Sequence, residues 1–226
     1  MSKAKQISTR QMVLLKWQRD GEMARKENST MTTFLGHPNV VQTVGILQGT
    51  YGWFLITEYD GGHDLKSEAK RNGLYSDAEC RDTLVQVLRA VRDLHEANVI
   101  HRDIKPHNIV TCGDEHDEDA TIKLIDFGLS CTLRPGYLRR ARVGTPNYVA
   151  PEVLTGRGYD SKVDMYSVGC TGYYLLKGKH FVDEGMATDW DGLEMQTIEF
   201  LRNLTSVDPT RRMSAKEALA HQWMTM

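Results

Sequence analysis

The chain has 226 residues, of which 40% are apolar and 26% charged, and its formal net charge is −2. This is an ordinary globular composition, with enough residues for one or two domains around a hydrophobic core. The charge balance argues against nucleic acid as a partner. The four scattered cysteines argue against a zinc site or a disulfide framework. The lack of a long apolar run predicts a soluble, cytoplasmic protein with no membrane contact.

The first third of the chain predicts strands around one helix. Residues 11–17 and 53–59 are short runs rich in β-branched and aromatic residues, which is typical of strands. Residues 22–36 between them predict a helix that ends at Gly36. The composition changes at Gly61 and Gly62, where we expect a hinge.

The strongest helix signal covers residues 77–97. Ser76 and Glu79 form a capping-box pattern, and apolar residues then recur on one face. Short strands are expected at 108–110 and 121–127.

Acidic residues fill the segment 113–119 between these two strands. It lacks the ligand spacing of an EF-hand loop, so a solvated hairpin tip is favoured over a calcium site. Further along, residues 161–177 are apolar on nearly all faces and predict a buried central helix, while 193–204 and 214–224 predict amphipathic helices.

Three motifs decide the functional interpretation. HRDIKPHN at 101–108 is followed by DFG at 126–128 and APE at 150–152, in the order and spacing of protein kinases. The chain therefore resembles the serine/threonine protein kinases. The resemblance implies an α+β fold with a reduced β-rich N-lobe at 1–60 and a mainly helical C-lobe at 61–226.

The resemblance also implies the reaction and the residues that perform it. Mg-ATP would give its γ-phosphate to a serine or threonine hydroxyl of a protein substrate. Asp103 would accept the hydroxyl proton, Lys105 would neutralise the transferred phosphate, and Thr145 would bond to both. Asn108 and Asp126 would hold Mg²⁺, which prefers oxygen ligands.

Further residues match positions that support the family's site. Asp164 would hold the backbone of the catalytic loop, and Glu152 with Arg212 would form a buried ion pair. The remaining structural positions of the two motifs are His101, Arg102, Phe127 and Gly128.

On the nucleotide side, Lys16 matches the strand lysine that binds the phosphates. Glu27 is favoured over Glu22 as its helix partner, because it lies ten residues before His37. The resemblance assigns the adenine and ribose side of the pocket to Thr57, Glu58 and Asp64.

Several features depart from the family. Residue 1 falls about where the Gly-rich phosphate loop should end, which predicts that the first strand and this loop are missing. Leu14 stands where a small alanine usually faces adenine, and Thr43 stands at a position that is usually apolar. The region 178–192 is short, so the lower-lobe helix expected there is predicted to be missing.

The activation segment is also unusual. Between Thr132 and Thr145 it has no serine or threonine, only Tyr137, and Ala141 occupies the usual phosphorylation position. We therefore expect no activation by phosphorylation of this segment. Its arginines favour a solvated or substrate-facing loop over a nucleic-acid site.

Three functions fit these residues to different degrees. The first is an active serine/threonine kinase, most similar to the calcium/calmodulin-dependent group by DFGLSCTLRPG and GTPNYVAPE. The second is a catalytically weak kinase-fold module that binds partners. A small-molecule kinase is disfavoured, because such enzymes lack a segment like GTPNYVAPE.

Overall fold

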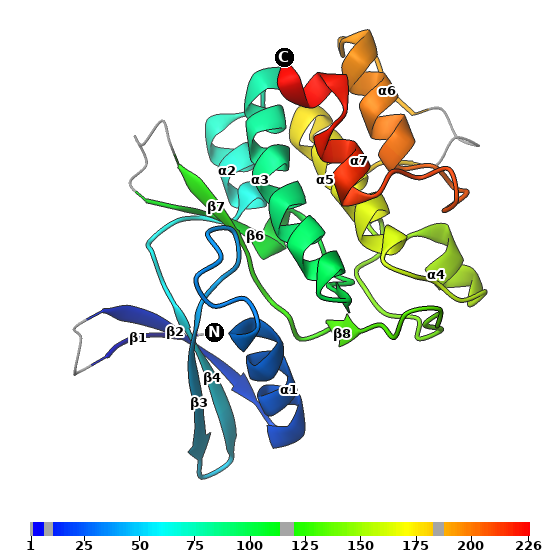
Figure 1. Ribbon diagram of the computed structural model, residues 1–226. Coiled ribbons are helices and arrows are strands. Elements are labelled where there is room, and N and C mark those ends of the chain that lie inside the picture. The colour runs from blue at the N-terminus through cyan, green and yellow to red at the C-terminus, as the bar shows by residue number, and fades with distance from the viewer. Residues whose placement is uncertain (1, 7–10, 114–119, 183–187) are drawn as a thin grey trace.

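A four-stranded antiparallel sheet in the order β1-β2-β4-β3 and one helix form the N-terminal lobe of the computed structural model (Figure 1). The structure describes residues 2–6, 11–113, 120–182 and 188–226. The elements of this lobe are β1 (Ser2–Lys5), β2 (Met12–Gln18), α1 (Gly21–Thr32), β3 (Thr43–Gly49) and β4 (Gly52–Glu58).

Strand β2 carries side chains of the nucleotide side of the predicted site. It pairs with β4 so that Leu14 lies opposite Thr57 and Lys16 opposite Leu55. Because successive side chains of a strand point to opposite faces, Leu14 and Lys16 share one face. Both line the cavity between the lobes.

Helix α1 is shorter than the sequence predicted. Asp20 caps its first turn by accepting the N–H of Glu22. The helix ends at Thr32 rather than near Gly36, and Thr33 is its C-cap. The hydroxyls of Thr32 and Thr33 bond back to carbonyls four residues earlier, and threonine is a poor helix former, which explains the early end.

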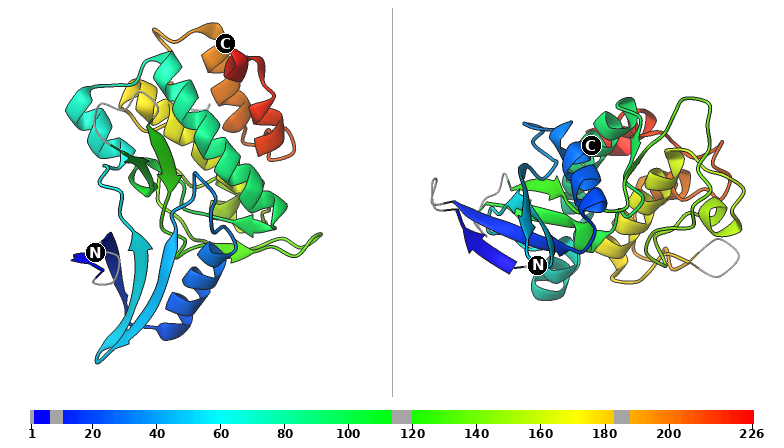
Figure 2. Two further views of the ribbon diagram at one scale, coloured as in Figure 1. Left: turned by 60° about the vertical axis from the view of Figure 1, so that its left-hand side comes forward. Right: turned by 90° about the horizontal axis from the view of Figure 1, so that it is seen from below.

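The C-terminal lobe is mainly helical, and the α+β class is confirmed (Figures 1 and 2). Its elements are α2 (Leu65–Asn72), α3 (Asp77–Glu96), β5 (Val99–Ile100), η1 (Pro106–Asn108), β6 (Ile109–Cys112), β7 (Thr121–Leu124), β8 (Cys131–Thr132), α4 (Pro151–Thr155), α5 (Lys162–Lys177), α6 (Met195–Leu204), α7 (Ala215–Leu219) and η2 (Gln222–Thr225).

Helices α3 and α5 form the centre of this lobe, as predicted. The capping box of Ser76 and Glu79 is present at the start of α3. Every residue from 163 to 176 of α5 is buried. The side chain of Leu84 in α3 lies so close to Gly172 in α5 that a methyl group there would approach it to 2.8 Å. The two helices therefore pack directly on one another.

Other predicted bounds differ from the structure. The strand expected at 121–127 ends at Leu124, because Asp126 turns the chain with a φ of 63°. The helix expected at 214–224 is split into α7 and η2, since His221 lies outside α7 and caps η2 by accepting the N–H of Trp223.

Two predictions fall wholly or partly outside the described residues. The acidic tip at 113–119 is described only at Gly113. Within 178–192, the described residues 178–182 and 188–192 contain no helix, and 183–187 lie outside. Among the described helices, none combines the length and apolar character that crossing a membrane requires.

Candidate active site

A cavity of about 310 Å³ lies between the two lobes. Its volume is in the range of sites that hold small molecules and cofactors. Leu14 and Lys16 line it from β2, Thr57 and Glu58 from β4, and Asp126 from the lower lobe. The predicted nucleotide-side residues therefore border one cavity.

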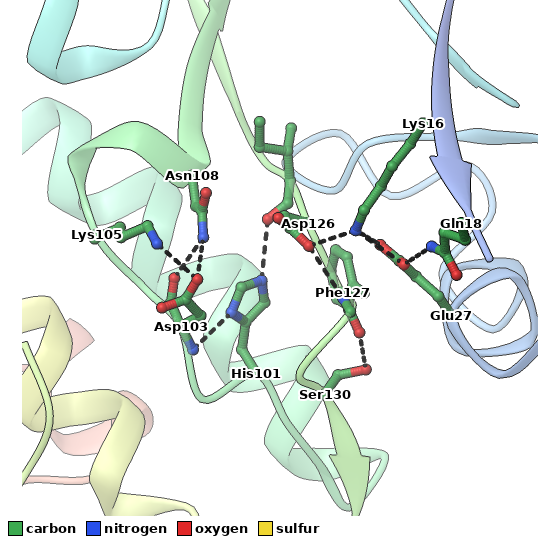
Figure 3. A network of polar contacts seen from close by, with 12 residues as sticks. Lys16, Gln18, Glu27, His101, Asp103, Lys105, Asn108, Asp126, Phe127 and Ser130 are labelled. Carbon is green, nitrogen blue, oxygen red and sulfur yellow. Dashed lines mark hydrogen bonds and ion pairs between the residues drawn. The ribbon is translucent and has the colours of Figure 1, made fainter. Parts of the chain in front are cut away.

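Lys16 lines this cavity and joins Glu27 and Asp126 in a polar network (Figure 3). Its Nζ lies 2.8 Å from Oε1 of Glu27 and 2.8 Å from Oδ1 of Asp126. The partner is thus Glu27 and not Glu22. Burial by itself lowers the pKa of Lys16, but the two carboxylates outweigh this effect and raise it.

The contact with Lys16 also changes the ionisation of Asp126. Burial opposes ionisation of its carboxyl, but the hydrogen bond and charge of Lys16 outweigh burial and lower its pKa. The φ of 63° at Asp126 is a strained conformation for a residue with a side chain. Strain of this kind at the meeting point of the lobes is typical of a functional position.

The catalytic loop brings four of the predicted residues together. Nζ of Lys105 lies 2.8 Å from Oδ2 of Asp103 and 2.6 Å from Oγ1 of Thr145. Thr145 donates to Oδ1 of Asp103 at 2.6 Å. Nδ2 of Asn108 donates to Oδ2 of Asp103 at 2.9 Å and to its backbone carbonyl.

Figure 3 shows which oxygens are left for a metal ion. The amide oxygen of Asn108 points away from Asp103, because its nitrogen makes the bonds to that residue. Asp126 adds a carboxylate, so the pair offers the hard oxygen ligands that Mg²⁺ prefers. No group of three or more His, Cys, Asp or Glu residues suited to a metal occurs in the described part of the chain. Two protein ligands leave room for phosphate and water, which is how Mg²⁺ is usually held.

Asp164 fixes the backbone of the catalytic loop from α5. Its carboxylate accepts the N–H of His101 at 2.9 Å and the N–H of Arg102 at 2.8 Å. Nε2 of His95 donates to it at 2.9 Å. Burial opposes ionisation of Asp164, but these donors outweigh it and lower its pKa.

The chain matches the protein kinase domain over residues 2–224. It belongs to the protein kinase family. The segments HRDIKPHN and DFG therefore lie within a kinase domain.

Relatives with related sequences are serine/threonine kinases. A probable serine/threonine-protein kinase, fhkD, of Dictyostelium discoideum is 32% identical over 83% of this chain and 29% of its own length. Calcium/calmodulin-dependent protein kinase type IV of Mus musculus is 34% identical over 84% of this chain and 44% of its own length. Type 1 of Macrobrachium nipponense is 36% identical over 84% of this chain and 59% of its own length.

These matches confirm the resemblance to the calcium/calmodulin-dependent group. They also show that the kinase domain described here corresponds to only part of each relative, between 29% and 59% of its length.

Two predicted residues of the kinase domain have structural contacts of their own. Asp64 is the N-cap of α2 and accepts the N–H of Ser67. Glu58 accepts the N–H of Gln42 and pairs with Lys123 at 2.7 Å. Both residues also line the cavity.

The predicted pair of Glu152 and Arg212 is present and buried. Nη1 of Arg212 lies 2.6 Å from Oε1 of Glu152, and Nη2 lies 3.1 Å from Oε2. This two-point contact joins α4 to the segment before α7. Removing one partner would leave a buried, unpaired charge, so we expect the loss of either side chain to destabilise the lobe.

The activation segment is attached to the catalytic loop by a tyrosine. Nη1 of Arg102 donates to the hydroxyl of Tyr159 at 3.0 Å, and this hydroxyl donates to the carbonyl of Ala141 at 2.8 Å. Nε of Arg102 donates to the carbonyl of Leu129. The guanidinium that kinases often pair with a phosphate is here bound to neutral oxygens.

Sequence reasoning missed two supporting residues. Gln18 donates to Oε2 of Glu27 at 2.6 Å, and the two-residue spacing from Lys16 on one strand could have indicated it. Tyr159 carries no such local signal, because its contacts with Arg102 and Ala141 join segments far apart in the sequence.

Thr43 makes a polar contact where the family is usually apolar. Its hydroxyl donates to Oδ1 of Asn28 at 2.6 Å. Asn28 follows Glu27 on α1, so this bond ties the helix to β3. The departure noted in the sequence therefore comes with its own hydrogen-bond partner.

Proposed function

We propose that this chain is a protein serine/threonine kinase that transfers the γ-phosphate of Mg-ATP to a protein hydroxyl. One observation carries the proposal. Asp103, Lys105 and Thr145 form one cluster, and Lys16 with Asp126 forms another at the cavity between the lobes. Phosphoryl transfer needs this combination, because it depends on positioning and charge neutralisation more than on covalent catalysis.

In the proposed reaction, the acceptor oxygen forms a bond to the γ-phosphorus while the bond from this phosphorus to the bridging oxygen breaks and ADP leaves. The carboxylate of Asp103 accepts the hydroxyl proton. Lys105 neutralises charge on the transferred phosphoryl group, and its contact with Asp103 and Thr145 holds it at the acceptor.

On the nucleotide side, Lys16 binds phosphate oxygens while Glu27 keeps its ammonium group in place. Asn108 and Asp126 would hold Mg²⁺, which screens the phosphate charge when bound. We propose that Thr57 and Glu58 border the adenine and Asp64 the ribose, since all three line the cavity.

The Asp126→Asn variant tests the proposal on the metal side. Mg-ATP at about 100 times its dissociation constant stabilises a native protein by about 2.7 kcal/mol, which is a rise of about 5–10 °C in Tm for a chain of this size. We expect this rise, and transfer of phosphate from γ-labelled ATP to a protein substrate, in the wild type. Both should be largely lost in the variant, measured by thermal unfolding and by counting labelled product.

Asp93→Asn is the matched control, because it replaces a carboxylate that pairs with His37 away from the cavity. It should keep the Mg-ATP shift and the transfer rate. Equal transfer by the wild type and by Asp126→Asn would contradict the proposal.

A second candidate is a kinase-fold module that binds partners and transfers phosphate weakly. The observation that favours it is that Leu14 lines the cavity, at the position where the family resemblance implies a small alanine. A wild type that gains no stability from Mg-ATP, yet retains partner binding, would favour this candidate.

A further inference from the structure

An unusual concentration of positive charge lies along the activation segment. Five arginines of this segment and of the loop after α4 are exposed: Arg134, Arg139, Arg140, Arg142 and Arg157. We call them the arginine patch. The chain as a whole is slightly acidic, with a net charge of −2, so the patch is a local feature and not part of a general basic surface.

Backbone contacts bring the patch together. Arg139 and Tyr159 exchange backbone hydrogen bonds of 2.9 and 2.8 Å, so the segment around 139 runs antiparallel to the segment around 159. The guanidinium of Arg142 lies 3.3 Å from the position that a methyl group on Gly156 would take. Arg157 follows directly, so three guanidinium-bearing residues share this edge of the lobe.

The patch is close to the acceptor site. Arg142 lies three residues before Thr145, so their Cα atoms are at most about 11 Å apart even in a fully extended chain. Thr145 itself bonds to Asp103 at 2.6 Å. A peptide whose hydroxyl reaches Asp103 therefore extends within reach of Arg142.

The positive charge of the patch is not neutralised by the described part of the protein. Arg139 donates to the carbonyl of Thr132, and no member of the patch forms an ion pair with a described carboxylate. Among the acids of the neighbouring segments, Glu152 pairs with Arg212, and Asp160 accepts the N–H of Lys162 and forms no ion pair with the patch.

We propose that this kinase selects acceptor serines or threonines flanked by acidic side chains, either carboxylates or phosphates, which bind the arginine patch. This inference rests on the function proposed above. Arginine suits both groups, because its planar guanidinium bonds to carboxylate and phosphate oxygens in a bidentate manner. A single-stranded nucleic acid is less suited, since such sites stack bases on aromatic side chains, and Tyr137 is the one aromatic residue between 133 and 144.

The test uses four serine peptides of equal length. Their flanking residues are glutamate, phosphoserine, alanine or arginine. Binding is measured by fluorescence anisotropy without ATP, and phosphate transfer as kcat/KM with Mg-ATP. The wild type should favour the glutamate and phosphoserine peptides over the alanine peptide by about fivefold or more, which is what one or two exposed ion pairs supply.

Two charge-reversed proteins locate the effect. Arg140→Glu with Arg142→Glu should remove the preference, in binding and in kcat/KM alike. Arg19→Glu with Arg89→Glu makes the same change in net charge at exposed positions away from the patch, and it should keep the preference. The preference should also shrink between 50 mM and 500 mM salt, because exposed charges are screened.

The outcomes separate the inference from the function on which it rests. Acidic peptides that bind the wild type but not the patch variant, with no phosphate transferred to any peptide, would contradict the kinase function and keep the patch as an acidic-peptide site. Transfer without preference, or with preference for the arginine peptide, would overturn the inference and keep the kinase. An oligonucleotide could also displace the acidic peptides at a concentration below the one at which the peptides themselves bind. That result would assign the patch to nucleic acid and overturn the inference.

Discussion

His101 shows how one buried side chain fixes its neighbours. Its Nδ1 accepts the N–H of Asp103 at 3.3 Å, and its Nε2 donates to the carbonyl of Ile125 at 3.2 Å. Its ring meets Phe127 edge-on, with centroids 4.8 Å apart. One nitrogen accepts and the other donates, so the imidazole is neutral in this arrangement.

This neutral imidazole leads to a prediction about pH. Burial lowers the pKa of His101 below its ordinary 6.5, and nearby aspartates only partly oppose it. Below pH 6.5 the unfolded chain therefore binds a proton that the folded chain does not, and stability falls with pH. The slope for one group is at most about 1.4 kcal/mol per pH unit, so we expect Tm to drop by up to about 3–5 °C per unit between pH 6.5 and 5.

The His101→Gln variant tests the assignment by thermal unfolding across this range. In this variant Tm should fall less steeply between pH 6.5 and 5, because the contribution of His101 is gone. The control variant His180→Gln replaces an exposed imidazole and should show the same fall of Tm as the wild type. A His101→Gln protein with the full wild-type slope would show that another group is responsible.

At the scale of the elements, hydrogen bonds that need no phosphate attach the activation segment to the catalytic loop. Replacing Tyr159 with Phe removes the hydroxyl that joins Arg102 to Ala141. A hydrogen bond to a charged group contributes about 1.5–3 kcal/mol, so we expect a loss of stability of this order and a lower kcat with little change in KM for ATP. Chemical denaturation and steady-state kinetics measure the two effects.

Tyr137→Phe is the matched control for Tyr159→Phe. Tyr137 is exposed and carries the one side-chain hydroxyl between 133 and 144. We expect this variant to behave like the wild type, because no phosphate is needed on the segment. Active protein with a phosphate on Tyr137, whose activity disappears in Tyr137→Phe, would contradict the account.

Elements were predictable from the sequence where the signal was local. Helix α3 was predicted because a capping box precedes a long amphipathic pattern, and α5 because its sequence is apolar on nearly all faces. Strand β1, with the sequence SKAK, was missed because it is polar and depends on pairing with β2. Helix α2 was also missed, although Asp64 as N-cap and Gly73 after its end were usable signals.

At the scale of the molecule, the site exists because the two lobes are joined at several points. Val40 in the segment after α1 forms a parallel bridge with Leu124 of β7. The N–H of Val41 donates to the carbonyl of Leu124 at 3.1 Å, and the N–H of Leu124 to the carbonyl of Asn39 at 2.9 Å. These bonds join the segment after α1 to β7, and across the same junction Nζ of Lys16 lies 2.8 Å from Oδ1 of Asp126.

The sequence motifs predicted the residues of this site but not its closed geometry. HRD and DFG identify Asp103 and Asp126 by local pattern. The contact of Lys16 with Asp126 spans 110 positions, so it follows from the packing of the lobes and from no local pattern.

The most direct test compares the wild type with Asp103→Asn, in γ-phosphate transfer and in Mg-ATP binding measured side by side. Asp103 is placed at the acceptor, and it does not line the nucleotide cavity. The account predicts that the variant binds Mg-ATP as the wild type does, while transfer falls by about 10²–10⁴, the contribution of a positioned base. Unchanged transfer by Asp103→Asn would contradict the account.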